Sequence, residues 1–140
     1  MADGGVQRFS SGGPYEQRIG YARAVRAGGF VLVAGCTAVG PDGEIVGGAD
    51  AGEQMREACR NVEAALALAG ATVADVVRTR MYVTDASRWE EIGRVHAEVF
   101  GAALPAAALV QVAGLLDPRM LVEVEATAWV GEGIAPRRRQ

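Results

Sequence analysis

The sequence predicts an α+β domain in which two helices lie on one face of a mixed β-sheet. Apolar runs with alternating or β-branched residues indicate strands, and two longer segments carry apolar residues at helical spacing. Their order along the chain is β-β-α-β-α-β-β. Two helices are too few to cover both faces of so wide a sheet, so we expect them to share one face. With 140 residues, half of them apolar, the chain suits one domain with its own core.

A flexible arm and a β-hairpin are expected at the start of the chain. The first 18 residues are polar and rich in glycine, which disfavours a packed structure. Strands are expected over residues 21–27 and 30–39, because Gly28-Gly29 between them accepts the positive φ of a tight hairpin turn. The predicted organisation is an arm, a domain and a C-terminal tail, over residues 1–18, 19–131 and 132–140.

Capping signals and apolar stripes predict the two helices. The expected capping pairs, an Asp or Ser followed three residues later by Glu, are Asp50 with Glu53 and Ser87 with Glu90. Gly70 and Gly101 stand where helix-terminating glycines belong. The stripes expected in the core are Met55, Cys59, Val62, Leu66 and Ala69, and then Trp89, Ile92, Val95 or His96, Val99 and Phe100.

Further strands are expected over residues 76–84, 105–112 and 120–130. The first of these alternates Val77, Thr79, Met81 and Val83 with Arg78, Arg80 and Tyr82. The uncovered sheet face is expected to carry Tyr21, Arg80, Tyr82, Glu123 and Glu125. Charges mixed with aromatic residues suit a subunit interface that holds water or a ligand, so the sequence predicts a homo-oligomer.

Composition excludes several kinds of chemistry. All 14 basic residues are arginine, so neither a Schiff-base lysine nor a P-loop lysine is present. His96 is the sole histidine, which excludes a multi-histidine zinc site in one chain, and no metal is expected. A net charge of −3 gives no reason to expect nucleic-acid or membrane binding. Two cysteines, and a polar start without the apolar segment of a signal peptide, predict reduced thiols in the cytoplasm.

Several segments resemble the reactive intermediate deaminase (Rid, or YjgF-type) family. Residues 19–25 (IGYARAV) resemble its opening GPYSQAV segment, and residues 33–37 (VAGCT) resemble its SGQ strand. The family's helix, third-strand and last-strand patterns are similar to residues 61–66, 77–85 and 121–126. The resemblance extends from about Tyr21 to Val130.

This resemblance implies a chorismate-mutase-like α+β fold and a homotrimer with small-molecule pockets between neighbouring subunits. It also implies hydrolysis of a reactive enamine or imine, such as 2-aminoacrylate, to a keto acid and ammonia without a metal or organic cofactor. In the family, an arginine on the strand after the second helix holds the substrate carboxylate. A glutamate on the last strand and backbone groups position water.

Carried over by position, the resemblance gives the candidate pocket residues Tyr21, Gly35, Cys36, Ala107, Leu109 and Glu125, with Glu125 and Tyr21 as the catalytic pair. The family pattern PARSC-V reads PAAALV here, so Ala107 replaces the arginine and Leu109 the cysteine, while a pocket asparagine falls on Gly93. Losing a bidentate arginine–carboxylate contact should cost roughly a few kcal/mol. A molecule as small as 2-aminoacrylate has no other group with which to recover that loss.

The acidic and aromatic candidates each have a structural interpretation as well. Glu125 is either the general acid/base or a strand carboxylate paired with an arginine at an interface. Glu123 either forms a close carboxylate pair with Glu125, which raises one pKa, or is solvated or salt-bridged. Tyr21 either closes the pocket over a ligand or packs at the interface.

The remaining candidates are expected to be mainly structural. Cys36 is expected to be an inert buried thiol, and Cys59 a core residue. His96 is expected to pack at the surface or at the core boundary. Arg23 and Arg80 either replace the lost anion anchor or form interface salt bridges.

The sequence therefore predicts a Rid-type homotrimer that hydrolyses a small imine, enamine or related metabolite other than 2-aminoacrylate. The alternative is a non-catalytic trimer that binds a small molecule or regulates. Ribonuclease activity, which has also been attached to the family, is disfavoured because the acidic chain lacks a basic stripe and a histidine pair.

Overall fold

The structure is a computed structural model that describes residues 5–131. Its strands are β1 (Val6–Phe9), β2 (Ala24–Ala27), β3 (Phe30–Cys36), β4 (Val76–Val83), β5 (Ala106–Gln111) and β6 (Val122–Trp129). Its helices are α1 (Pro14–Ile19), α2 (Ala51–Leu68) and α3 (Trp89–Phe100), with short 3-10 helices η1 (Val73–Asp75) and η2 (Ala86–Arg88). The six strands form one sheet in the order β1-β2-β3-β6-β4-β5.

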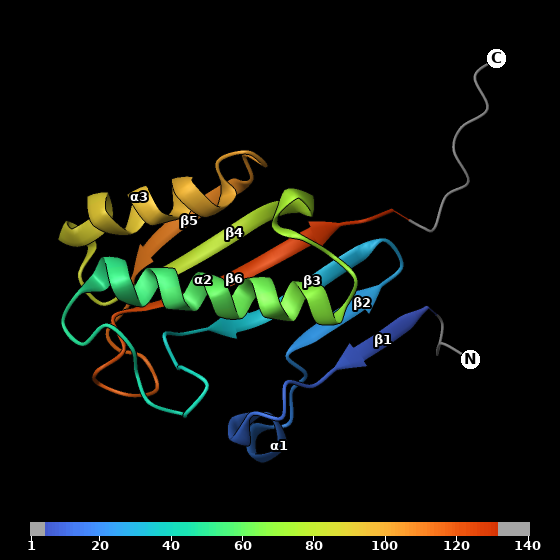
Figure 1. Cartoon of the computed structure of the whole chain (residues 1–140), viewed down its shortest axis with the longest axis horizontal. Coiled ribbons are helices and arrows are strands. Elements are labelled where there is room, and N and C mark those ends of the chain that lie inside the picture. Colours follow the sequence, from blue (N-terminus) through green and yellow to red (C-terminus); the bar gives the residue numbers. More distant parts are fainter. Residues whose placement is uncertain (1–4, 132–140) are drawn as a thin grey trace.

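The predicted α+β class and mixed sheet are confirmed. Strands β4 and β5 run parallel, and the other neighbouring pairs are antiparallel. The predicted β-β-α-β-α-β-β order corresponds to β2, β3, α2, β4, α3, β5 and β6. Helices α2 and α3 lie side by side on the same face of the sheet (Figure 1).

The N-terminal segment departs most from the expected fold. The flexible arm predicted over residues 1–18 is wrong for the described residues, which contain β1, paired with β2, and most of α1. Pro14 stands in the first turn of α1, where its missing N–H costs nothing, and Gly20 ends the helix with a φ of 87°. A strand of four residues and a helix of six are too short to show a clear periodicity. The tail predicted over residues 132–140 lies outside the described residues.

Helix α2 supplies one side of the core. It starts as predicted, because the Asp50 side chain accepts a hydrogen bond from the Glu53 N–H at 3.1 Å. Its predicted stripe, Met55, Cys59, Val62, Leu66 and Ala69, is buried. On the sheet side, the alternate β6 residues Val122, Val124, Ala126 and Ala128 are buried. Full burial of a large apolar side chain contributes about 1.5–3 kcal/mol, so this layer stabilises the fold.

Three local details differ from the sequence prediction. Val77 is predicted on the buried side of β4 but is 45% exposed, because the β4–β6 register shifts beside it. Asp85, and not Ser87, accepts the capping bond before α3, from the Ser87 N–H at 3.0 Å. Trp89 is predicted in the core but is 57% exposed at the start of α3.

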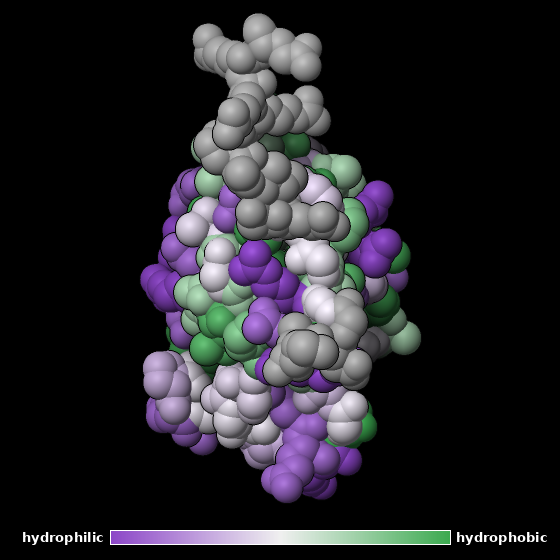
Figure 2. Space-filling model, turned by 90° about the vertical axis from the view of Figure 1, so that its right-hand side faces the viewer, coloured by the Kyte–Doolittle hydropathy of each residue, from purple (hydrophilic) through white to green (hydrophobic). Residues whose placement is uncertain are grey.

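The sheet face opposite α2 and α3, which we call the open face, is uncovered in the single chain. Phe30 and Trp129 lie on it as an edge-to-face pair with ring centroids 4.8 Å apart, each about half exposed. Figure 2 views the molecule from the side of the β2–β3 turn and shows hydrophilic and hydrophobic residues interspersed there. Among residues 5–131, no helix is long and apolar enough to cross a membrane.

Candidate functional site

Two glutamates of β6 lie on the open face. Glu123 and Glu125 alternate with buried valines and are themselves half-buried. In the β4–β6 register, Glu125 stands opposite Arg80, and Glu123 stands opposite Tyr82. Directly opposite residues of antiparallel strands have Cβ atoms about 4.5–5.5 Å apart. These four residues therefore form one group, which we call the β4–β6 cluster.

Ionisation within the β4–β6 cluster is coupled. Burial, and then the negative charge of Glu125, raise the pKa of Glu123, while the positive charge of Arg23 opposes this shift. A hydrogen bond with Glu125, together with burial, raises the pKa of Tyr82. The negative charge of Glu125 therefore adds to the effect of burial on the pKa of Glu123, in the direction expected for a close carboxylate pair.

Gly35 of β3 lies against Glu123. A Cβ atom at position 35 would be 2.8 Å from the carboxyl carbon of Glu123, closer than real Cβ atoms approach a neighbour. A side chain here would therefore displace the carboxyl group. The β3–β6 register shifts between Val33 and Cys36, and Cys36 is buried in the core. The structure thus places Gly35 beside the β4–β6 cluster and Cys36 on the opposite side of the sheet.

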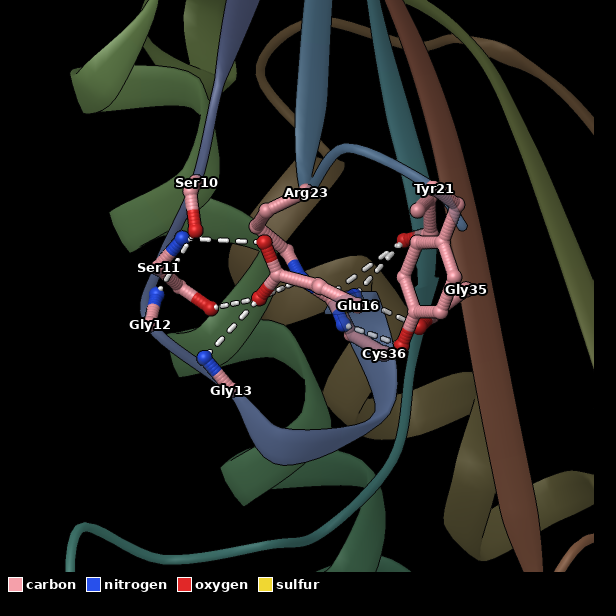
Figure 3. A network of polar contacts seen from close by, with 10 residues as sticks. Ser10, Ser11, Gly12, Gly13, Glu16, Tyr21, Arg23, Gly35 and Cys36 are labelled. Carbon is pink, nitrogen blue, oxygen red and sulfur yellow. Dashed lines mark hydrogen bonds and ion pairs between the residues drawn. The ribbon is translucent and has the colours of Figure 1, made fainter. Parts of the chain in front are cut away.

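Arg23 joins three of the predicted pocket residues (Figure 3). Its guanidinium donates to the Gly35 carbonyl at 2.7 Å, to the Tyr21 hydroxyl at 3.1 Å and to the Cys36 Sγ at 3.4 Å. Its central carbon is 5.4 Å from the centroid of the Tyr21 ring. Its Nε atom is 3.9 Å from a carboxylate oxygen of Glu16. Arg23 therefore holds the segment before β2, strand β3 and helix α1 together.

Glu16 of α1 organises the loop beside Tyr21. Its carboxylate accepts hydrogen bonds from the Ser11 N–H at 3.2 Å, the Ser11 hydroxyl and the Gly13 N–H at 3.1 Å. Burial alone would raise the pKa of Glu16, but these hydrogen bonds together outweigh it and lower the pKa. An open hollow of about 350 Å³ beside this carboxylate is lined by Ser10, Gly12, Gly13, Glu16, Gln17 and Tyr21.

Both cysteines are unsuited to act as nucleophiles. Cys36 is 3% exposed, and burial raises the pKa of its thiol against the opposing charge of Arg23. Burial also raises the pKa of Cys59 to about 12, and its predicted place in the core is confirmed. Because the thiolate is the reactive form, both thiols are held in the unreactive state at neutral pH.

Ala107 and Leu109 do not meet Glu125 within one chain. On β5, Ala107 is in register with Thr79 and Leu109 with Met81, two buried residues on the helix-covered side of β4. Leu109 packs against the core, while Ala107 is exposed at the edge of the sheet. The predicted pocket residues are therefore divided between the two sides of the sheet.

The edge near Ala107 also contains the sole histidine. His96 Nε2 and Thr79 Oγ1 are 2.7 Å apart, and burial lowers the pKa of His96, which favours the neutral ring. His96 is half-buried, in agreement with the predicted boundary packing. Within residues 5–131, no group of three or more His, Cys, Asp or Glu residues is arranged to hold a metal ion.

A second segment of the chain resembles the family's opening motif more closely than residues 19–25 do. Residues 13–19 (GPYEQRI) share G, P, Y and Q with the GPYSQAV pattern, whereas residues 19–25 share only Y, A and V. This alignment places α1 on the motif and makes Tyr15, which is 39% exposed, a second position for the family's tyrosine. This motif lies inside the segment predicted as an arm, residues 1–18.

Comparison with known proteins shows the family of this chain. The family model described as endoribonuclease L-PSP matches residues 15–130. An uncharacterized protein of Streptomyces coelicolor is 38% identical over 94% of this chain and 97% of its own length. The 3-aminoacrylate deaminase RutC of Acinetobacter baylyi is 31% identical over 79% of this chain and 86% of its own.

Solved structures give the same result. A Mycobacterium tuberculosis protein described as a member of the YjgF family superposes with a TM-score of 0.80 at 50% identity, covering 89% of this chain and 99% of the other. A Rid family protein of Yersinia pestis gives a TM-score of 0.74 at 30% identity, covering 79% of this chain and 88% of the other. The chain therefore belongs to the endoribonuclease L-PSP family, which includes the YjgF and Rid proteins.

Proposed function

We propose that this protein is a cofactor-free deaminase that hydrolyses the C–N bond of a small imine or enamine. The observation that carries the proposal is the position of Glu125, a half-buried carboxylate on the open face that stands opposite Arg80. The similarity to a 3-aminoacrylate deaminase supports this class of substrate, because 3-aminoacrylate is itself an enamine.

Glu125 supplies the proton transfers that the reaction needs. As water attacks the imine carbon, the carboxylate takes a proton from it, and a C–O bond forms while the C=N π electrons move to nitrogen. Glu125 then returns the proton to nitrogen, which gives a carbinolamine. The same carboxylate next takes the proton of the new hydroxyl group and delivers it to nitrogen while the C=O π bond forms and the C–N bond breaks, so a carbonyl compound and ammonia leave. Tyr82, whose pKa is raised by its interaction with Glu125, lies in the same β4–β6 cluster.

A homotrimer completes the site in this proposal. One chain leaves Phe30 and Trp129 about half exposed on the open face and separates Ala107 from Glu125. A neighbouring subunit that covers the open face brings its own β5 edge to the Glu125 of the first. A monomeric mass by light scattering at micromolar concentration contradicts this arrangement.

The substrate is expected to be larger than 2-aminoacrylate, because Ala107 on β5 offers neither the charge nor the hydrogen bonds of an arginine, and an anchor elsewhere on the sheet would lie at a different distance from the reacting carbon. We expect 2-aminoacrylate, generated by a dehydratase, to be hydrolysed about tenfold or more slowly than by an arginine-bearing family member. Imines generated from larger amino acids by an oxidase are expected to be hydrolysed faster in the presence of the protein. Keto-acid and ammonia release measure both rates. Equal rates on 2-aminoacrylate contradict the substrate restriction, and the absence of acceleration on every imine contradicts the proposed activity.

The loss of the arginine also favours a second function, a trimer that binds a small molecule without turnover. The relevant observation is Ala107 itself, since the position that anchors substrate in the deaminases lacks a polar group. A ligand that raises the melting temperature and is recovered unchanged distinguishes this function from the first.

A further inference from the structure

We propose that Arg80 is the anion anchor of this protein, so that the substrate is an imine carrying a carboxylate. This inference rests on the proposed function and names the substrate class of the same site. It moves the anchor from the β5 edge to β4, within the chain that provides Glu125.

Arg23, the other arginine near the site, is already engaged. Its guanidinium donates to the Gly35 carbonyl and the Tyr21 hydroxyl and lies near Glu16. Its side chain is 16% exposed, and binding a ligand would break contacts that hold β3 to α1. The contacts that a substrate carboxylate would form with Arg23 are therefore offset by the contacts within the protein that Arg23 would lose.

Arg80 is placed differently. It is exposed on the open face, and among the described residues neither an ion pair nor a side-chain hydrogen bond engages its guanidinium. It stands directly opposite Glu125, and its charge acts on the Tyr82 hydroxyl, so the guanidinium is within electrostatic reach of the catalytic group. An anion held by Arg80 thus lies beside the carboxylate that would activate water.

The neighbouring strand carries small side chains at this point. On β5, the residues in register with Arg78 and Arg80 are Ala106 and Ala108, whose side chains are single methyl groups. A guanidinium between a small-residue strand and Glu125 can present its N–H groups to a carboxylate in a bidentate contact.

Arg78 provides a matched control. It is the same residue type on the same strand and face, but it stands opposite Thr127 rather than Glu125. Residues two apart on a strand are separated by roughly 6.6 Å, so Arg78 lies diagonally from Glu125 instead of directly opposite it.

The test compares two imines that differ only in a carboxylate. An L-amino-acid oxidase converts leucine to 2-imino-4-methylpentanoate, and an amine oxidase converts 3-methylbutylamine to the corresponding imine without the carboxylate. For the Arg80→Gln variant of the full chain, we expect kcat/KM on the first imine to fall by about ten- to a hundredfold, mainly through KM. For the second imine, we expect kcat/KM of Arg80→Gln to equal that of the wild type. We expect kcat/KM of Arg78→Gln to stay within about twofold of the wild type on both imines. Arg80→Lys should recover part of the loss on the first imine.

Other outcomes separate the inference from the proposed function. If Arg80→Gln lowers kcat equally on both imines, Arg80 acts through Glu125 and is no anchor. If it changes neither rate, the anchor is refuted while the deaminase activity stands.

If the wild type accelerates neither imine, the proposed activity fails for this class, and titration calorimetry with 4-methyl-2-oxopentanoate decides the anchor alone. There we expect at least about tenfold weaker binding by Arg80→Gln than by Arg78→Gln. Equal affinity of the two variants for the keto acid, or no binding by the wild type, overturns the assignment of Arg80 as the anchor.

Discussion

Replacing Glu125 with Gln is expected to abolish turnover of the proposed imine substrate. The amide keeps the size and hydrogen-bonding reach of the side chain, but it cannot take a proton from water or return one to the leaving nitrogen. Removing a positioned acid/base group typically lowers the rate by about 10²–10⁴-fold, so the residual rate should approach that of spontaneous hydrolysis. Steady-state kinetics on the preferred imine of the proposed panel measures the effect.

Glu90→Gln is the control, since Glu90 is an exposed carboxylate on α3, away from the open face. Its rate should equal that of the wild type. Glu123→Gln separates the two β6 carboxylates. If Glu123→Gln loses the activity while Glu125→Gln keeps it, the roles given to the two residues must be exchanged.

Replacing Gln54 with Ala is expected to lower the free energy of unfolding by about 3 kcal/mol. Gln54 is fully buried in α2, and its amide donates to the carbonyls of Gly48 at 2.7 Å and Arg119 at 2.8 Å. Its carbonyl accepts from the Leu121 N–H at 2.9 Å. Alanine leaves these three backbone groups without their partner, and each unsatisfied buried group costs about 1–3 kcal/mol.

Urea denaturation at one fixed protein concentration measures this change, because the proposed trimer would make stability concentration-dependent. Glu63→Ala is the matched control, an exposed position on the same helix, and should change stability by no more than about 0.5 kcal/mol. A loss below about 1 kcal/mol for Gln54→Ala means that water or loop movement replaces the three bonds.

The parts of the fold that the sequence predicts are those governed by local signals. Asp50 caps α2 through the Glu53 N–H, three residues away. Gly28 has the positive φ, 58°, that the hairpin turn requires. The alternation of β6 shows directly which of its residues are buried, because successive side chains of a strand point to opposite faces.

The errors fall where partners distant in the sequence decide the outcome. Val77 is exposed because β4 shifts register against β6, a strand more than 40 residues away. Strand β1 is stabilised by pairing with β2, which lies outside its own segment. The glycine-rich residues around β1 do not indicate this pairing, and by themselves they predict a flexible arm. The GPYEQ motif and Glu16 lie in this same segment. The Glu16 carboxylate accepts hydrogen bonds from the N–H groups of Ser11 and Gly13 and so organises the loop beside Tyr21.

The sequence by itself determined the α+β class, the family pattern, and the absence of an arginine at Ala107, because composition, periodicity and motifs are local properties. Only the tertiary structure decided what the other arginines do. Pairing of strands and helices that are distant in sequence engages Arg23 with Gly35 and Tyr21, whereas the β4–β6 register sets Arg80 opposite Glu125. Which side of the sheet a residue occupies, and whether its charge is already satisfied, depends on such long-range pairing, so residue type alone could not assign these roles.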